Sequence, residues 1–202
     1  MSSKTSDKKE NRMQFTYDEI NTSRLLLRKP VINDDSAIFS LFSDEEILKY
    51  SGIKKHGTIN ESQSAIMEFD EGINSSKLLI WAVCLKPFDK LVGLIGILYI
   101  NHDHHFGSFA SVLEKKYWKK GIISEAHRAV ISWAFENTEL NRIESQFYEN
   151  HPAVEKMLIK SGMIREGILR ENFLIENKHV NSIIYSVTKN DYLKNPSFYK
   201  SV

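Results

Sequence analysis

The segment at residues 117–126, Tyr-Trp-Lys-Lys-Gly-Ile-Ile-Ser-Glu-Ala, places two lysines and a glycine directly before a predicted helix. The first N–H groups of a helix have no partner inside the helix, and the helix dipole is positive at that end, so such a start favours anions. Gly121 allows a ligand to approach the backbone closely, while Lys119 and Lys120 add positive charge. The segment therefore predicts a phosphate site, and the alternative is an ordinary loop with solvated lysines.

Two further places carry groups that could move a proton. A turn at residues 101–105 holds three histidines, among them His105, and histidine titrates in the pH range where a general base works. The alternative there is a plain polar turn, and its spacing is weak evidence for a metal, so we expect none. Glu144 shares one face of a predicted strand with Tyr148 and is either a base or a solvated or ion-paired carboxylate.

The composition indicates one soluble globular domain. The chain has 202 residues, of which 42% are hydrophobic and 26% charged, and its net charge of +1 implies no strong attraction to nucleic acid or membranes. The single cysteine, Cys84, excludes an internal disulfide and a cysteine-based zinc site, and its apolar surroundings favour a buried, inert thiol. With no apolar run near the ~18 residues of a membrane span and no signal sequence, we expect a cytoplasmic protein.

The first third of the chain reads as a tail, a strand and helices. Residues 1–12 are almost wholly polar and predict a mobile tail, whereas residues 13–20 carry apolar groups that can pack on the domain. Residues 24–28 form an apolar run that ends before Pro30, as a strand does. Helices are predicted after the capping residue Asn33 or Asp34, near residues 44–50, and from residues 58–60 to Gly72.

The remainder alternates strands with two helices. We predict a buried strand at 78–85, strands at 91–100 and 106–113 that complete an antiparallel meander, and a helix at 122–138 in which Trp133 faces the core. A strand at 142–148, a helix from Pro152 to Gly162, and two strands at 163–173 and 180–187 follow. This order predicts an α/β or α+β domain over residues 13–195, with a mixed sheet and a C-terminal tail at 196–202.

The chain resembles the GNAT acyltransferases, and in particular the RimJ/RimL-type N-acetyltransferases, from about residue 21 to residue 191. The matching segments are, in chain order, residues 22–28, 81–83, 92–96, 117–126, 140–143 and 160–167. The resemblance implies a mostly antiparallel central sheet of about seven strands with helices on both faces. It also implies acetyl-CoA as the cosubstrate, an amine as the acceptor, and no requirement for a metal.

The resemblance also implies where acetyl-CoA lies. The pantetheine arm would occupy a gap between the fourth and fifth strands of the fold and pair with backbone at Val112 and Leu113. The pyrophosphate would bind the backbone amides from Lys119 through Ser124, which include Lys120, Gly121, Ile122 and Ile123. At the start of the last helix, Asn150 and His151 would contact the coenzyme, although His151 could instead cap that helix.

Several positions depart from the family pattern. The family prefers glycine or alanine at Ile123, and its fourth strand often carries a glutamate base where this chain has Ser108, which could hold a water instead. His151 and Val154 stand where the family has asparagine and serine. Leu158 stands where some relatives have a tyrosine that protonates the leaving thiolate. The candidate catalytic residues are therefore Ser108, His105 and Glu144.

We predict an N-acetyltransferase that moves the acetyl group of acetyl-CoA directly to a primary amine, on either a protein N-terminus or a small molecule. The enzyme would position both reactants, polarise the thioester carbonyl with backbone N–H groups and accept the amine proton. The alternative is a catalytically weak or inactive module of the same fold that binds acyl-CoA or another protein. Either a monomer or a homodimer is compatible with the sequence.

Overall fold

The computed structural model describes residue 13 and residues 15–49, 53–175 and 177–202. Its described part contains an eight-stranded sheet in the order β1-β2-β3-β4-β5-β6-β8-β7. The strands are β1 (Ile20–Asn21), β2 (Leu25–Arg28), β3 (Leu79–Leu85), β4 (Lys90–Asn101), β5 (Phe106–Leu113), β6 (Arg142–Tyr148), β7 (Ile164–Ile175) and β8 (Lys178–Thr188). Every neighbouring pair is antiparallel except β5 and β6. The predicted mixed, mostly antiparallel sheet is confirmed, and the short β1 is the strand that the sequence analysis did not predict.

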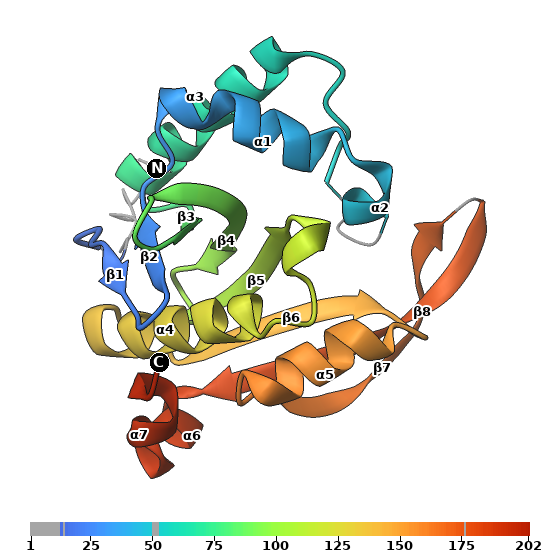
Figure 1. The fold of residues 1–202 in the computed structure, drawn as a ribbon. Helices are drawn as coiled ribbons and strands as arrows, with labels where there is room; N and C mark the ends of the chain where they lie inside the picture. Colours follow the sequence, from blue (N-terminus) through green and yellow to red (C-terminus); the bar gives the residue numbers. More distant parts are fainter. Residues whose placement is uncertain (1–12, 14, 50–52, 176) are drawn as a thin grey trace, which may run out of the picture.

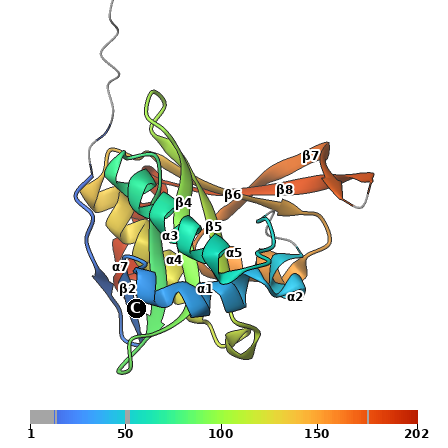
Figure 2. The same cartoon turned by 90° about the horizontal axis from the view of Figure 1, so that it is seen from above.

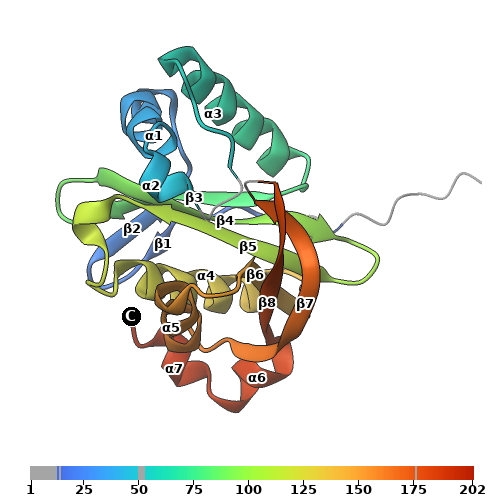
Figure 3. The same ribbon diagram turned by 90° about the vertical axis from the view of Figure 1, so that its right-hand side faces the viewer.

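Helices cover both faces of this sheet (Figures 1 and 3). One face carries α1 (Asp35–Phe42), α2 (Glu45–Leu48) and α3 (Ile59–Asn74). The other carries α4 (Ile122–Asn137) and α5 (Pro152–Lys160), with the short α6 (Lys189–Lys194) and α7 (Pro196–Lys200) outside them. The helix starts follow local chemistry: Asp44 accepts hydrogen bonds from the backbone N–H groups of Glu46 and Ile47, and Thr58 with Glu61 forms a capping box.

Alternation along the central strands builds the two halves of the core. On β3, Leu79, Trp81 and Val83 pack in the cluster that includes α4, while Ile80 and Cys84 pack in the cluster under α1 and α3. The buried Trp133 of α4 meets Trp81 edge to face, with ring centroids 5.2 Å apart, as expected for a core residue. Cys84 is fully buried, so the predicted burial of this thiol is confirmed, and burial raises its pKa to about 12.

Both ends of the described chain pack on this core. The Met13 side chain is buried, and the Tyr17 hydroxyl donates to the Ile80 carbonyl at 2.8 Å, so the prediction that this segment packs back on the domain is confirmed for Met13 and Tyr17. The predicted mobile tail at 1–12 lies outside the described residues. The prediction of a C-terminal tail at 196–202 was wrong, because residues 196–200 form α7 and Tyr199 is buried in the main core cluster.

Two hairpins extend beyond the layers, as Figure 2 shows. The β4–β5 hairpin contains the histidine-rich turn at residues 101–105, and the β7–β8 hairpin lies on another side of the molecule. Within the first hairpin, His102 Nδ1 accepts a hydrogen bond from the Met13 N–H at 3.1 Å, and its ring stacks on Phe15. His102 therefore holds the N-terminal segment in place. None of the helices described is long and apolar enough to cross a membrane.

Candidate functional site

The two parallel strands β5 and β6 separate partway along their length. Their register pairs Phe106 with Arg142, Gly107 with Ile143 and Ser108 with Glu144. Beyond that point β5 continues to Leu113 and β6 to Tyr148, and the two strands no longer pair with each other. A strand edge whose N–H and C=O groups have no neighbouring strand can pair with an extended ligand. Ser108 and Glu144 therefore mark the closed end of a gap in the sheet.

The β4–β5 ladder decides which residues of β5 face this gap. The Glu114 N–H donates to the Val92 carbonyl at 2.8 Å, so the hydrogen-bonded pairs are 92/114 and, two residues along, 94/112. The backbone of Val112 therefore points toward β4, and the expectation that it pairs with the coenzyme was wrong. Ser111 and Leu113 point toward the gap instead. The Leu113 carbonyl already accepts a hydrogen bond from Trp118 Nε1 at 2.8 Å, which leaves its N–H for a ligand.

The loop after β5 leads into α4 through two residues in the left-handed region. Lys119 has φ 62° and Gly121, the N-cap of α4, has φ 76°. Glycine adopts this conformation freely, whereas a lysine there costs about 1 kcal/mol. No side chain caps the helix, so its first N–H groups point into the space before it. The partly buried Ile123 packs against the main core cluster, which keeps its side chain away from that space.

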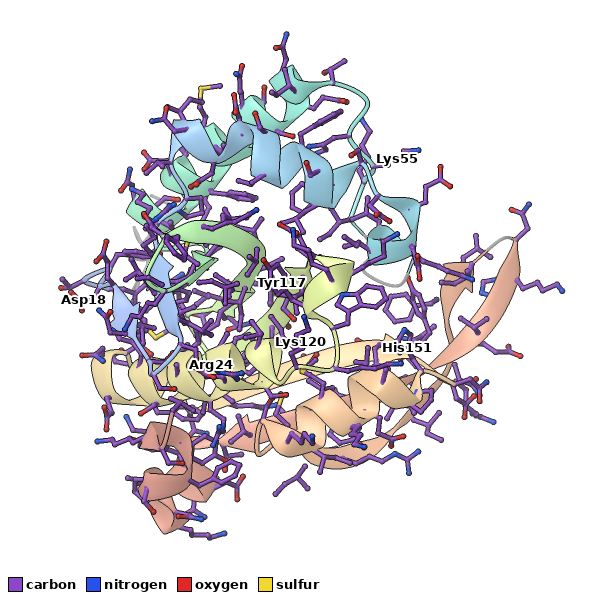
Figure 4. The ribbon with its side chains drawn as sticks, in the orientation of Figure 1. Asp18, Arg24, Lys55, Tyr117, Lys120 and His151 are labelled. Carbon is purple, nitrogen blue, oxygen red and sulfur yellow. The ribbon has the colours of Figure 1, made fainter. Side chains whose placement is uncertain are left out.

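The lysines of the loop are exposed. Lys120 Nζ lies over the Tyr117 ring at 5.5 Å from its centroid, and neither Lys119 nor Lys120 forms an ion pair with another described residue. Figure 4 shows Tyr117 and Lys120 between Arg24 on the side of β2 and His151 at the start of α5. The uncapped helix start and two unpaired cations together form a site that fits a diphosphate.

Glu125, in the first turn of α4, ties the loop to the β1–β2 turn. Its carboxylate accepts hydrogen bonds from the Thr22 hydroxyl at 2.6 Å and from Arg24 Nε at 2.7 Å. Arg24 Nη1 in turn donates to the Lys120 carbonyl at 3.1 Å. Burial alone would raise the pKa of Glu125, but the hydrogen bonds from Thr22 and Arg24 and the charge of Arg24 lower it overall. Sequence analysis did not identify this bridge, which joins residues far apart in the chain.

The start of α5 lies on the opposite side of the gap. His151 Nδ1 accepts a hydrogen bond from the Val154 N–H at 3.4 Å, so His151 does cap α5. The exposed Asn150 directly precedes it with φ 68°. The buried Ser124 of α4 points toward α5, with its hydroxyl 3.5 Å from the Met157 carbonyl. Backbone N–H groups of residues 122–124, rather than the Ser124 side chain, therefore remain for a ligand.

The three predicted catalytic residues have different surroundings. Glu144 and Ser108 are neighbours in register, but Arg142 donates to Glu144 at 3.0 and 3.1 Å and also binds Glu166. The structure thus favours the ion-paired reading of Glu144. His105 precedes Ser108 by three residues, about 10 Å along an extended strand. Its carbonyl accepts from the Asn141 N–H at 2.7 Å at the closed side, so His105 is not brought to the gap.

A pocket that the sequence analysis did not predict lies between the α1–α3 layer and the sheet. Its lining comes from α1, the segment before α3, α3 itself and strands β3 to β5. The residues are Phe42, Ile53, Lys54, His56, Ala65, Phe69, Ile80, Leu94, Ile95, Gly96, Leu98, Ala110, Ser111 and Val112. Because Ser111 also faces the gap, pocket and gap meet along β5. No local pattern identifies such a pocket, since its walls come from distant segments.

The family assignment follows from comparison with known sequences. The pattern of the family described as "Acetyltransferase (GNAT) domain" matches residues 24–164. The chain belongs to the GNAT acetyltransferase family. It is an acetyl-CoA-dependent N-acetyltransferase. The gap between β5 and β6 and the uncapped start of α4 are suited to binding such a coenzyme. The alternative of an inactive binding module is not favoured.

Individual relatives agree with this assignment. The chain is 26% identical to "Uncharacterized N-acetyltransferase YoaA" of Bacillus subtilis (strain 168) over 170 residues, which are 84% of this chain and 96% of that protein. Its fold is similar to the ribosomal-protein-S5-alanine acetyltransferase of Vibrio fischeri (TM-score 0.77, 19% identity, 87% of this chain and 99% of that one). It is also similar to the microcin C7 self-immunity acetyltransferase MccE, solved with acetyl-CoA and AMP (TM-score 0.75, 18% identity, 83% and 93%). The RimJ/RimL-type resemblance is thereby confirmed for the fold.

Proposed function

We propose that this enzyme transfers the acetyl group of acetyl-CoA to a primary amine that is attached to an apolar body. The observation that carries the proposal is the meeting of gap and pocket at Ala110, Ser111 and Val112 of β5. A thioester held along the open edge of β5 would lie beside the pocket, and an amine in that pocket could reach its carbonyl carbon. Most of the lining side chains are aliphatic or aromatic, which suits an apolar body next to the amine.

The coenzyme would lie across the open end of the gap. Its pantetheine amides would pair with the free backbone groups of Ser111 and Leu113, as an added strand does. Its pyrophosphate would bind the N–H groups of residues 122–124, with Lys119 and Lys120 beside it. Asn150 and His151 would border the coenzyme from the start of α5.

The reaction itself would be direct transfer. The amine nitrogen attacks the thioester carbonyl, a C–N bond forms, the C–S bond breaks, and the thiolate of CoA leaves. The chain contributes by holding both reactants in contact and by offering backbone N–H groups of β5 to the developing oxyanion. Binding of both substrates in fixed positions is the main source of rate in this account.

The acceptor class predicts a preference that kinetics can measure. Phenethylamine should be acetylated with a kcat/KM about 10- to 100-fold above that of spermidine, because burying a phenyl group contributes about 1.5–3 kcal/mol. The release of the CoA thiol measures the rate with each amine, and mass spectrometry identifies the acetylated product. A preference for spermidine would contradict the apolar-acceptor proposal.

A substitution that fills the pocket tests whether the acceptor amine binds there. Ala65→Phe, in the lining from α3, should raise the KM for phenethylamine and leave acetyl-CoA binding unchanged. The control is Met67→Phe on the same helix, at a side chain that is 61% exposed. A peptide with N-terminal phenylalanine is the second probe: its acetylation without that of phenethylamine would identify a protein N-terminus as the acceptor.

A further inference from the structure

The pocket contains one imidazole that the sequence analysis did not consider. Among the residues that line it, only Lys54 and His56 have ionisable side chains. A lysine ammonium has no lone pair for a proton, whereas a neutral imidazole has one. His56 stands in the segment directly before α3, next to Lys55, which Figure 4 labels above the sheet.

One backbone contact and two ring contacts hold His56 in place. Its backbone N–H donates to the Phe42 carbonyl at 2.8 Å, and its ring meets the Phe42 ring edge-on with centroids 4.9 Å apart. Its Nδ1 lies 2.9 Å from the hydroxyl of Ser62, which is completely buried in α3. With Nδ1 engaged by Ser62, Nε2 is the ring nitrogen available to the pocket.

The surroundings keep this imidazole neutral. Burial lowers the pKa of His56; Glu61 raises it, Lys54 lowers it and Glu68 raises it, and the result lies below the ordinary value for histidine. Glu61 does not bind the ring, since its carboxylate accepts the N–H groups of Gly57 and Thr58 at 2.5 and 2.9 Å. His56 is therefore a free base at neutral pH.

The residues first considered for this role are less suitable. Glu144 is held by Arg142, Ser108 is a poor base by itself, and the carbonyl of His105 binds the closed side of the β5–β6 pair. None of them lines the pocket. His56 combines a free lone pair with a position in the pocket wall.

We propose that His56 accepts the proton that the acceptor amine releases during acetyl transfer. This inference rests on the proposed function, which places the amine in the pocket. This role assigns His56 the tautomer in which Nδ1–H donates to Ser62 Oγ and the lone pair is on Nε2, since either atom of this 2.9 Å contact can be the donor. As the amine nitrogen bonds to the thioester carbon and the C–S bond breaks, one N–H proton passes to Nε2, directly or through one water. The imidazolium then returns that proton through solvent to the CoA thiolate, giving the amide and CoASH.

The test uses the full chain with phenethylamine and N-terminal-phenylalanine peptide as probes. His56→Asn keeps an amide N–H near the position of Nδ1 for Ser62 but removes Nε2. We expect kcat/KM for the amine to fall about 100-fold, within the usual range for general base catalysis, while acetyl-CoA affinity by calorimetry stays unchanged. The ionisation of the amine itself gives one limb of the kcat/KM profile and stays. The further acidic limb, whose apparent pKa lies below that of free imidazole, should disappear. Ser62→Ala, as a positioning variant, should lower kcat less and leave the limb visible.

The outcomes are distinct. His179→Asn, at an exposed histidine of β8, is the matched control and should keep wild-type rates. Retention of kcat and of the acidic limb by folded His56→Asn would overturn the role of His56 and leave the acceptor proposal intact. A wild-type enzyme that binds acetyl-CoA but acetylates neither probe would overturn the acceptor proposal and the role of His56 with it.

Discussion

Glu125 is a single side chain on which the shape of the phosphate loop depends. Its buried carboxylate binds Thr22 and Arg24, and Arg24 also holds the Lys120 carbonyl. A buried carboxylate is stable only when such donors compensate its loss of hydration. The loop conformation, with Lys119 in the left-handed region, is therefore maintained by contacts to the β1–β2 turn as much as by its own sequence.

Replacing Glu125 by glutamine should lower the free energy of unfolding by about 1–3 kcal/mol at pH 7, since charge-assisted hydrogen bonds are lost. The folded pKa of Glu125 is lowered below its ordinary 4.5, so its contribution is complete above that value and is lost as pH falls through the folded pKa. Urea titrations from pH 7 down to pH 3 should show the difference between the two proteins shrink. Glu139→Gln, at an exposed position, is the control; a difference that is independent of pH would contradict this account.

Individual residues were predicted from sequence only where their role is local. The helix start that follows Lys119 and Lys120 could be predicted because its features are contiguous: two cations, a glycine and an apolar periodic run. Val112 was assigned wrongly, because strand direction alone does not tell which neighbour a backbone group faces; the β4–β5 register does. Glu125 and His56 were missed because their partners and neighbours come from distant segments.

At the scale of elements, the end of α5 and the short α7 depend on each other. Gly162 follows α5 with φ 84°, and a β-carbon there would lie 2.6 Å from the Tyr199 hydroxyl oxygen and 2.9 Å from a ring carbon of Phe198. Tyr199 donates to the Gly162 carbonyl at 3.2 Å. The glycine therefore has two roles: it ends α5, and its lack of a side chain leaves room for α7 to pack there.

Gly162→Ala should destabilise the fold by about 2–4 kcal/mol, since left-handed strain of about 1 kcal/mol adds to overpacking of about 1–3 kcal/mol. Gly167→Ala on β7 is the control, because a β-carbon there meets nothing within 4 Å and should change stability by less than about 0.5 kcal/mol. Thermal and urea unfolding measure both. Equal stability of the two variants would contradict the docking of α7.

The elements themselves were mostly predictable. Apolar periodicity and the start signals at Asn33 or Asp34, at residues 58–60 and at Pro152 located the main helices, and apolar runs located seven strands. The short β1 and α7 escaped, because elements of two and five residues carry no measurable period. The separation of β5 from β6 could not be inferred from the residues themselves, because it depends on how the two strands pair. Only the family resemblance implied it.

For the molecule as a whole, the proposed function places the two substrates in contact with each other beside strand β5. The coenzyme is assigned to the side of the sheet where α4 and α5 begin, and the acceptor to the pocket under α1 and α3, and β5 borders both. Net charge of +1 gives no overall attraction for a polyanion, so the charge that binds a diphosphate must be local. The central proposal is that the loop leading into α4 binds the pyrophosphate of acetyl-CoA.

Calorimetric titration of acetyl-CoA tests that claim most directly. The wild-type chain should bind with micromolar affinity, and Lys119→Glu/Lys120→Glu should weaken binding about tenfold or more, with a difference that shrinks as salt is added. The control is Lys77→Glu/Lys178→Glu, which makes the same charge change at two exposed lysines of other segments and should bind as the wild type does. Equal weakening by the control pair, or no binding by a folded wild-type chain, would contradict the assignment of the loop as the pyrophosphate site.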